Sequence, residues 1–296
     1  MTDGTTIPGE QTPLRARRQV RAGWGIVAVW LAATVTAALS SGSSIPAVAE
    51  AVSGATLAVF VVFHALTQYR PGGVAGYFGI ALAVAFGFEA CSVATGFPFG
   101  SYVHHLEGPR LLGVPFVVVL GWVLLAWLAW MLARVIVGDQ SNRGVQVGLT
   151  PAVATLVLGG YDLVIDPIAA HARGLYSYGE PSGALGVPLT NYFGWVLTGW
   201  VLFQTFALVE RRWRRAPAGS ARSTLSMPAV IWFGLALQVN LEMLRVGDAT
   251  ATIQGGRSVA VADIYETCSA TAWFTMVLVA VVAVARLCQG GSQPAA

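Results

Sequence analysis

The stretch Gly113–Val137 reads GVPFVVVLGWVLLAWLAWMLARVIV and carries a single charged residue, Arg134. A helix needs about 20 predominantly apolar residues to cross the hydrocarbon core of a bilayer, and this stretch is long enough. Lipid offers no hydrogen-bond partner to backbone amide and carbonyl groups, so such a segment must satisfy them within a helix. The stretch therefore predicts a transmembrane helix.

Seven further stretches have the same character. The predicted bounds of all eight are Trp24–Ser40, Pro46–Thr67, Ala75–Ala94, Gly113–Val137, Val147–Ile165, Pro188–Val209, Met227–Leu244 and Val259–Leu287. The composition agrees, because 55% of the residues are hydrophobic and only 10% are charged, against about 25% charged in a soluble domain. The sequence thus predicts an all-α, polytopic integral membrane helical bundle of about eight transmembrane helices, and it excludes a soluble globular protein, a disordered chain and a coiled coil.

The 17 basic residues are all arginines, and their positions predict how the bundle is oriented. If the N-terminus is inside, the inner side holds Arg15, Arg17, Arg18, Arg21, Arg70, Arg134, Arg143, Arg211, Arg212, Arg214, Arg215, Arg222 and Arg286. The outer side holds only Arg110, Arg173, Arg245 and Arg257. Cytoplasmic loops of membrane proteins are enriched in basic residues, so we expect both termini to be cytoplasmic.

This orientation divides the chain into three parts. Residues 1–22 form a basic cytoplasmic arm without the apolar run of a cleavable signal peptide, residues 23–287 form one transmembrane domain, and residues 288–296 form a short tail. We expect a multi-pass protein of the cell membrane, namely the bacterial inner membrane. The net charge of +3 is too small to indicate nucleic acid as a partner.

Five acidic residues fall within the predicted helices, all toward the outer side. They are Glu89, Asp162, Asp166, Glu242 and Glu266. An ionised group inside a membrane costs about 2.5–3.5 kcal/mol on insertion scales, so each needs a functional or structural reason. We expect these carboxylates, which come from four helices, to converge at one membrane level.

Asp162 and Asp166 are four residues apart and share one face of a helix. Two carboxylates that close can share a proton, which keeps a carboxylic acid available at neutral pH. The alternative is that Asp166, directly before Pro167, merely ends its helix. Asn191 at the start of the sixth helix is either part of the same site or a hydrogen-bonding contact between helices.

The outer loops combine glycine and proline with aromatic residues, as in TGFPFGSY at Thr95–Tyr102 and GLYSYG at Gly174–Gly179. These loops predict a structured lid, although aromatic residues also gather at membrane interfaces on general grounds. The four histidines, His64, His104, His105 and His171, show no ligand spacing, so we expect no metal site.

Two segments resemble the signatures of a known family. The first is EACSVATGFPFGSY at Glu89–Tyr102, followed by LGVP at Leu112–Pro115 and by Trp122. The second is YDLVIDP at Tyr161–Pro167, followed by GVPLTNYFGW at Gly186–Trp195. Together they resemble the CruF-type carotenoid hydratases, which include carotenoid 1,2-hydratases and archaeal bisanhydrobacterioruberin hydratases. The chain departs from the family at Tyr161, where tryptophan is usual, and at His104, where a second aromatic residue is common.

The resemblance implies addition of water to the terminal isopropylidene double bond of a linear carotenoid, which gives a tertiary alcohol without any cofactor. The implied partners are a lipid-soluble carotenoid, water and other carotenoid-pathway enzymes of the membrane. In our hypothesis Asp162 is the general acid. Asp166 or Glu89 either adjusts the acidity of Asp162 or orients the water, and Asn191 helps to hold that water. The expected substrate-binding aromatic residues are Phe97, Phe99, Tyr102, Tyr161, Tyr192 and Trp195.

Three other functions remain open from the residues themselves. Buried carboxylates and broken helices also mark proton-coupled transporters. A carotenoid cyclase or isomerase could use the same acid and cation-stabilising aromatic residues and end the reaction by proton loss. A noncatalytic scaffold for pigment enzymes would tolerate carboxamide substitutions at the carboxylates.

Overall fold

The computed structural model describes residues 11–40, 44–138, 142–183, 185–215, 221–253 and 256–289. Within them, eight helical spans are long and apolar enough to cross a membrane, which confirms the predicted helical bundle. Residues 1–10 of the predicted arm and residues 290–296 of the predicted tail lie outside the described residues.

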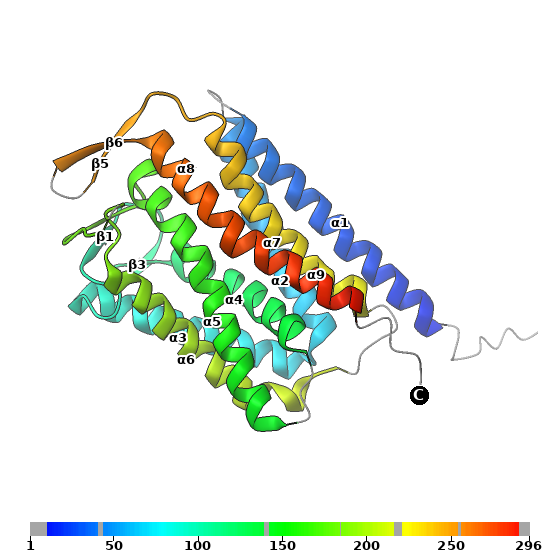
Figure 1. Cartoon of the computed structure of the whole chain (residues 1–296). Coiled ribbons are helices and arrows are strands. Elements are labelled where there is room, and N and C mark those ends of the chain that lie inside the picture. The colour runs from blue at the N-terminus through cyan, green and yellow to red at the C-terminus, as the bar shows by residue number, and fades with distance from the viewer. Residues whose placement is uncertain are drawn as a thin grey trace, which may run out of the picture.

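The helices and strands follow one another in a simple order (Figure 1). The helices are α1 Gln11–Leu39, α2 Ile45–Gln68, α3 Pro71–Thr95, α4 Phe116–Val137, α5 Arg143–Pro167, η1 Ile168–Ala172, α6 Leu189–Val209, η2 Glu210–Trp213, α7 Ala221–Met243, α8 Val261–Ala272, η4 Trp273–Val277 and α9 Leu278–Gln289. The short strands are β1 Tyr102–His104, β2 Arg110–Leu111, β3 Val114–Pro115, β4 Tyr176–Tyr178, β5 Thr250–Ile253 and β6 Arg257–Ala260. The eighth span runs continuously through α8, η4 and α9.

The two largest differences from the predicted helix boundaries are at the start of α1 and at the end of α5, where η1 follows. Helix α1 begins at Gln11 instead of Trp24, so part of the expected arm continues the first helix. Helix α5 does not end at Asp166, because it includes Pro167 and passes directly into the π-helical turn η1, which ends at Ala172. Single π-helical turns of this kind occur frequently at functional sites.

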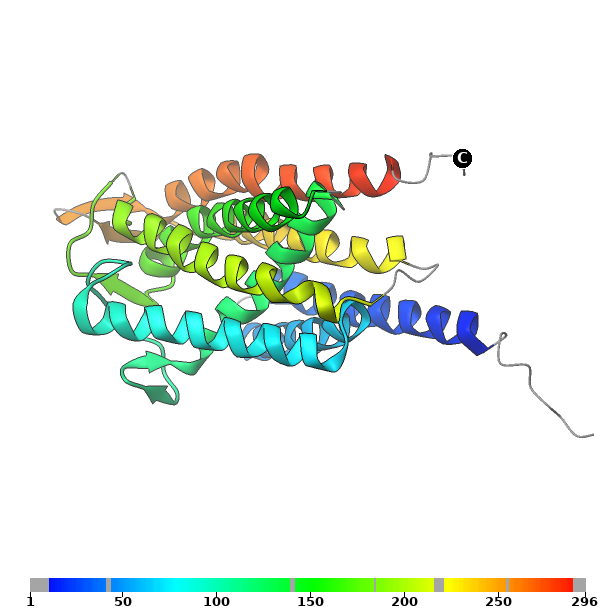
Figure 2. The same ribbon diagram turned by 90° about the horizontal axis from the view of Figure 1, so that it is seen from below.

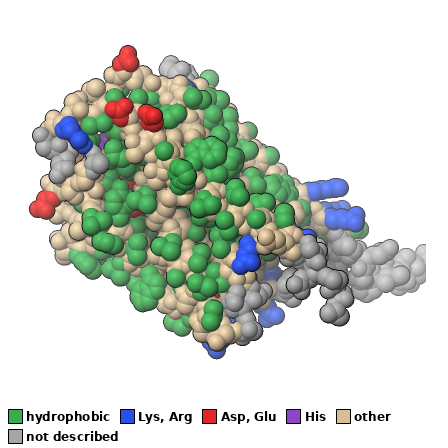
Figure 3. Space-filling model, in the orientation of Figure 1, with side chains coloured by type: hydrophobic (Ala, Val, Ile, Leu, Met, Phe, Trp, Pro, Cys, Tyr) green, Lys and Arg blue, Asp and Glu red, His purple; other side chains and the backbone are tan. Residues whose placement is uncertain are grey.

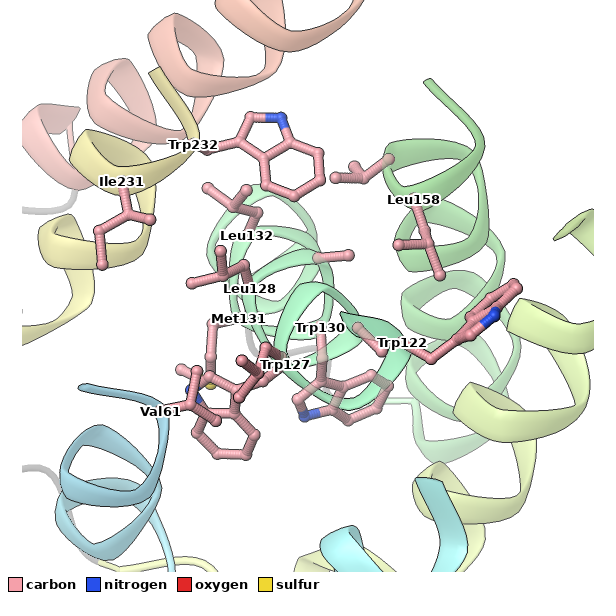
Figure 4. Close-up of a cluster of buried hydrophobic side chains, with 14 of the residues drawn as sticks. Val61, Trp122, Trp127, Leu128, Trp130, Met131, Leu132, Leu158, Ile231 and Trp232 are labelled. Atoms are coloured by element: carbon pink, nitrogen blue, oxygen red, sulfur yellow. The ribbon is translucent and has the colours of Figure 1, made fainter. Parts of the chain in front are cut away.

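Helix α4 forms the centre of the bundle. Its tryptophans Trp122, Trp127 and Trp130 are almost completely buried. Figure 4 shows Val61 of α2, Leu158 of α5 and Trp232 of α7 approaching α4 from different sides. Apolar side chains thus surround this helix, which explains why it has the most hydrophobic of the eight sequences.

The two ends of the bundle differ in structure and charge. The labelled strands lie at one end, whereas α1 begins and α9 ends at the other (Figures 1 and 2). On the face shown in Figure 3, most arginines lie at the end where α1 begins, and the acidic side chains lie at the opposite end. The described chain ends are therefore on the same side of the bundle.

Candidate functional site

A two-stranded ladder covers the strand-bearing end of the bundle. Strands β1 and β4 pair antiparallel, with Tyr102 opposite Tyr178 and His104 opposite Tyr176. Successive side chains of a strand point to opposite faces. The outward-facing Val103 is 61% exposed, whereas its neighbours on the other face line a cavity below. The ladder therefore forms a roof with polar aromatic side chains on its inner face.

The cavity has a volume of about 190 Å³ and lies between α3, α4, α5 and α6. Its walls combine apolar and aromatic side chains with two carboxyl groups and one amide. The lining residues are Glu89, Phe99, Tyr102, His104, Leu106, Val118, Gly121, Trp122, Leu125, Tyr161, Ile165, Asp166, Ala169, Leu175, Tyr176, Tyr178, Asn191 and Trp195. Because an apolar cavity of about 150 Å³ can hold benzene, this one has room for a small hydrocarbon group.

Glu89, near the end of α3, is one of the two carboxyl groups in the cavity wall. Its side chain accepts a hydrogen bond from Tyr102 Oη at Oε2 and another from Trp122 Nε1 at Oε1, the latter 2.8 Å long. His104 Nε2 lies 3.5 Å from Oε2 and forms an ion pair with Glu89 when the histidine is protonated. Three elements of the fold, β1, α3 and α4, thus fix the position of this carboxyl group.

Asp166, on α5, is the second carboxyl group in the cavity wall. Tyr176 Oη donates a hydrogen bond to Oδ1, and Tyr178 Oη donates one of 2.8 Å to Oδ2. Asn191 Nδ2, at the start of α6, also donates to Oδ2. Donors from β4 and α6 therefore fix the positions of both oxygens of the Asp166 carboxyl group.

Asp162 lies one turn earlier on α5 and is not part of the cavity wall. Its side chain is fully buried, and its nearest donor is Asn191 Nδ2, 3.4 Å from Oδ2. Within the described part of the chain, its Oδ1 has no hydrogen-bond partner. The two aspartates thus form the predicted neighbouring pair, but only Asp166 faces the cavity.

The roof tyrosines remain protonated hydrogen-bond donors. Burial, and then the negative charge of Glu89, raise the pKa of Tyr102 above its ordinary value. Burial and the charge of Asp166 raise the pKa of Tyr176 and of Tyr178 in the same way. All three phenols therefore keep their protons well beyond neutral pH.

Four of the six predicted aromatic residues line the cavity, namely Phe99, Tyr102, Tyr161 and Trp195. Trp195 stacks on Trp122 with 3.9 Å between ring centroids, and Phe99 lies 5.9 Å from Trp122. The structure does not bring the other two, Phe97 and Tyr192, into the cavity wall, and Phe97 is 58% exposed.

Besides Asp162, two of the five carboxylates expected at one membrane level, Glu242 and Glu266, lie outside the cavity wall. Glu266 is exposed on α8 and does not approach the cavity. Glu242 is paired with Arg173, with 2.5 Å between Oε1 and Nη2, and accepts a hydrogen bond from Tyr265. Glu242 lies behind Tyr161, which lines both the main cavity and a small neighbouring cavity that Glu242 also lines. The contact with Arg173 gives this acid a structural reason to lie within the bundle.

Four further residues contribute to the site, although no role was predicted for them individually. Trp122, His104, Tyr176 and Tyr178 all line the cavity. The alternation Tyr176-Ser177-Tyr178 is the sequence signal that could have indicated a strand with both tyrosines on one face. Among the described residues, no group of three or more His, Cys, Asp or Glu side chains could hold a metal ion.

Comparisons with known proteins agree with this arrangement. Residues 49–256 match the family of carotenoid biosynthesis proteins. The bisanhydrobacterioruberin hydratase of Haloarcula japonica is 34% identical over 177 residues, which are 53% of this chain and 58% of the relative. The chain thus aligns with less than two thirds of that protein's length. No solved structure matches the chain. Since the family match extends over more than half of the sequence and includes both signature segments, this multi-pass membrane protein belongs to the carotenoid biosynthesis protein family, and its resemblance to the CruF-type hydratases is confirmed.

Proposed function

We propose that the protein adds water to the terminal isopropylidene double bond of a linear carotenoid and forms a tertiary alcohol. The observation that carries this proposal is the presence of Glu89 and Asp166, from two different helices, in the wall of one small and largely aromatic cavity. An acid-catalysed hydration needs one group that gives a proton and one that takes a proton from water. The related hydratase supports the same reaction class.

The reaction is redox-neutral and needs no cofactor. A carboxylic acid transfers its proton to the less substituted carbon of the double bond, whose π electrons form the new C–H bond. The other carbon becomes a tertiary cation, and a water oxygen attacks it. The oxonium ion then loses one proton to a carboxylate, so that one water molecule has been added in total. Transfer of that proton from one carboxyl group to the other restores the starting state of the protein.

The geometry favours the Asp162–Asp166 pair as the source of the proton. Asp166 has three hydrogen-bond donors, whereas fully buried Asp162 has one long contact with Asn191. Two such close carboxylates do not both ionise easily, so the pair retains a proton. We assign the contact with the alkene to Asp166, and we assign a positioning role to Asp162, which holds the shared proton behind it.

Glu89 is then the group that receives the proton of the attacking water. Tyr102 and Trp122 donate hydrogen bonds to its two oxygens, and His104 Nε2 lies 3.5 Å from Oε2, so this carboxyl group is held at the cavity wall. The stacked rings of Trp122 and Trp195 and the ring of Phe99 present aromatic faces or edges to the cavity, and aromatic faces stabilise a cation without forming a bond to it.

A location in the bacterial inner membrane fits this substrate, because a linear carotenoid dissolves in the bilayer. We infer cytoplasmic termini from the arginines that gather where α1 begins, which puts the cavity at the outer side of the membrane. The reacting partners are then the carotenoid within the bilayer and water from the adjacent interface. Other pathway enzymes in the same membrane supply the carotenoid.

The direct test is the pigment profile of a lycopene-producing host that expresses the chain. The wild type should add one water per modified end, and Asp166→Asn and Glu89→Gln should each lower the yield of alcohol by about 10²–10⁴-fold. Glu266→Gln is the matched control, because this carboxyl group is exposed on α8 and should leave the profile unchanged. Full activity of both cavity variants would overturn the assignment.

The same experiment separates hydration from cyclisation. A cyclase or isomerase using these acids would produce carotenoids with the mass of the substrate, because its cation loses a proton in place of gaining water. An unchanged mass with an altered chromatographic position would therefore refute the hydratase proposal and support the cyclase. An unchanged pigment profile with well-expressed protein would support the scaffold.

A further inference from the structure

The cavity wall formed by α4 changes character at Gly121. A helix turns by about 100° per residue, so Gly121 lies between the direction of Val117 and Leu120 and the direction of Val118 and Leu125. Val117 and Leu120 are 54% and 45% exposed, on the lipid-facing side of the bundle. Val118 and Leu125 line the cavity. Gly121 therefore forms the edge between the cavity and the lipid.

The space beside this glycine is open. Among the residues that the structure describes, a Cβ atom added to Gly121 would meet no atom within 4 Å outside its own helix backbone and chain neighbours. Gly121, Val118 and Leu125 are all partly exposed even though they line the cavity. Ile165 on α5 is likewise partly exposed and lines the same cavity. These four residues mark an apolar mouth of the cavity, which we call the α4 mouth.

The size of the cavity requires such a mouth. A volume of about 190 Å³ is only slightly larger than one that holds benzene, so it can enclose the end group of a linear carotenoid but not the polyene chain. The chain must leave the cavity along an apolar path. The next residue after Gly121 is Trp122, which donates a hydrogen bond to Glu89, so the mouth lies close to the reacting carboxyl groups.

We propose that the polyene passes out of the cavity through the α4 mouth into the lipid and that Gly121 is a specificity-determining residue because it has no side chain there. The inference rests on the proposed function for the identity of the substrate. It predicts selection by chain length: a large residue at position 121 excludes substrates whose chain extends beyond the cavity, and it leaves room for short alkenes with the same isopropylidene end.

The test uses the graded variants Gly121→Ala and Gly121→Leu in lipid nanodiscs, with Gly79→Leu as the control. Gly79 is exposed on α3 and does not line the cavity, and a Cβ there also meets no atom of the described chain within 4 Å. The first measurement is the binding of lycopene, which is monitored by the shift of its absorption spectrum. The second is turnover of lycopene and of a short alkene with the same end group.

Gly121→Leu should weaken lycopene binding and lower its kcat/KM by about tenfold or more, with a much smaller loss for the short alkene. Gly121→Ala should have an intermediate effect and should fold at least as well as the wild type, because alanine is the better helix former. Gly79→Leu should match the wild type in all assays.

Unchanged lycopene binding in Gly121→Leu, or equal losses with the long and the short substrate, would overturn the proposal. The binding measurement also separates it from the proposed function. A wild type that binds lycopene but hydrates neither substrate would refute the hydratase function, and the comparison of Gly121→Leu with Gly79→Leu would still decide whether the chain passes position 121.

Discussion

Tyr102 and Tyr178 lie opposite each other in the β1–β4 ladder, and each donates a hydrogen bond to a different carboxyl group of the cavity. Tyr102 contacts Glu89 on α3, and Tyr178 contacts Asp166 on α5. One short ladder, whose strands are far apart in the chain, therefore sets the positions of both reactive groups. Any movement of the roof must change both contacts together.

Loss of the Tyr102 phenol or of the Tyr178 phenol should reduce activity, and the effects of the two losses should not be independent. A hydrogen bond to a charged group contributes about 1.5–3 kcal/mol, so Tyr102→Phe and Tyr178→Phe should each lower kcat by about 10–100-fold. Because both act through one ladder, the double variant should lose less than the product of the two single effects. The measurement is hydration kinetics of the four proteins. Strictly multiplicative losses would refute the coupling, and the outward-facing Ser177→Ala serves as the control.

The roof should also make the protein sensitive to alkaline pH. Tyr102, Tyr176 and Tyr178 have a pKa raised above the ordinary value in the folded state. In the unfolded chain these phenols ionise at about pH 10, as tyrosines in model peptides do. Their contribution to stability is thus complete below about pH 10 and is lost as the pH rises further, because the folded state then binds more protons than the unfolded state.

Thermal unfolding in detergent between about pH 8 and pH 11 checks this expectation. The wild type should lose stability toward the alkaline end. Tyr178→Phe should lose less over the same range, since it removes one of the titrating groups. An identical pH dependence in the two proteins would contradict the assigned environment of Tyr178.

Gly194 on α6 fixes the position of Phe99 in the cavity wall. A Cβ atom at position 194 would lie 2.4 Å from Cδ1 of Phe99, which is too close for any real contact. Gly194→Ala should therefore displace the Phe99 ring, destabilise the protein by about 1–3 kcal/mol and reduce hydration. The measurements are the denaturation midpoint and the initial rate, with Gly79→Ala as the control. Wild-type activity in Gly194→Ala would show that the Phe99 position is unimportant.

Two buried threonines should respond differently to valine. The hydroxyl of Thr198 is fully buried and has no hydrogen-bond partner among the residues described, so Thr198→Val should leave stability unchanged or raise it by about 1 kcal/mol. Thr150 accepts a hydrogen bond of 2.8 Å from Gln146, so Thr150→Val should lower stability by about 0.5–1.5 kcal/mol. Unfolding in detergent measures both. A marked loss of stability in Thr198→Val would mean that its hydroxyl has a bound partner.

The sequence was sufficient to predict the features that depend on local composition. Each membrane span is set by a run of apolar residues, so eight spans could be located, including Gly113–Val137, which became α4. The spacing of Asp162 and Asp166 placed both on one helical face. The helix continues beyond them through Pro167, because η1 adds a π-helical turn that no local pattern distinguishes from a helix end.

The parts of the site that depend on distant contacts could not be predicted. The pairing of Tyr102 with Tyr178 joins residues from two loops, and neither loop alone specifies its partner. For the same reason the sequence could not show that Asp162 lies behind Asp166, or that Glu266 faces away from the cavity. Which side of a helix faces the cavity is decided by packing against the other helices.

The central claim is that the cavity adds water to a carotenoid end group, and isotope incorporation tests it most directly. Purified protein in lipid nanodiscs should be incubated with a linear carotenoid in water enriched in ¹⁸O, and the products analysed by mass spectrometry. The account predicts a tertiary alcohol that carries one ¹⁸O atom per modified end, absent when Asp166→Asn is used. A product of unchanged mass, or an alcohol without ¹⁸O, would contradict it.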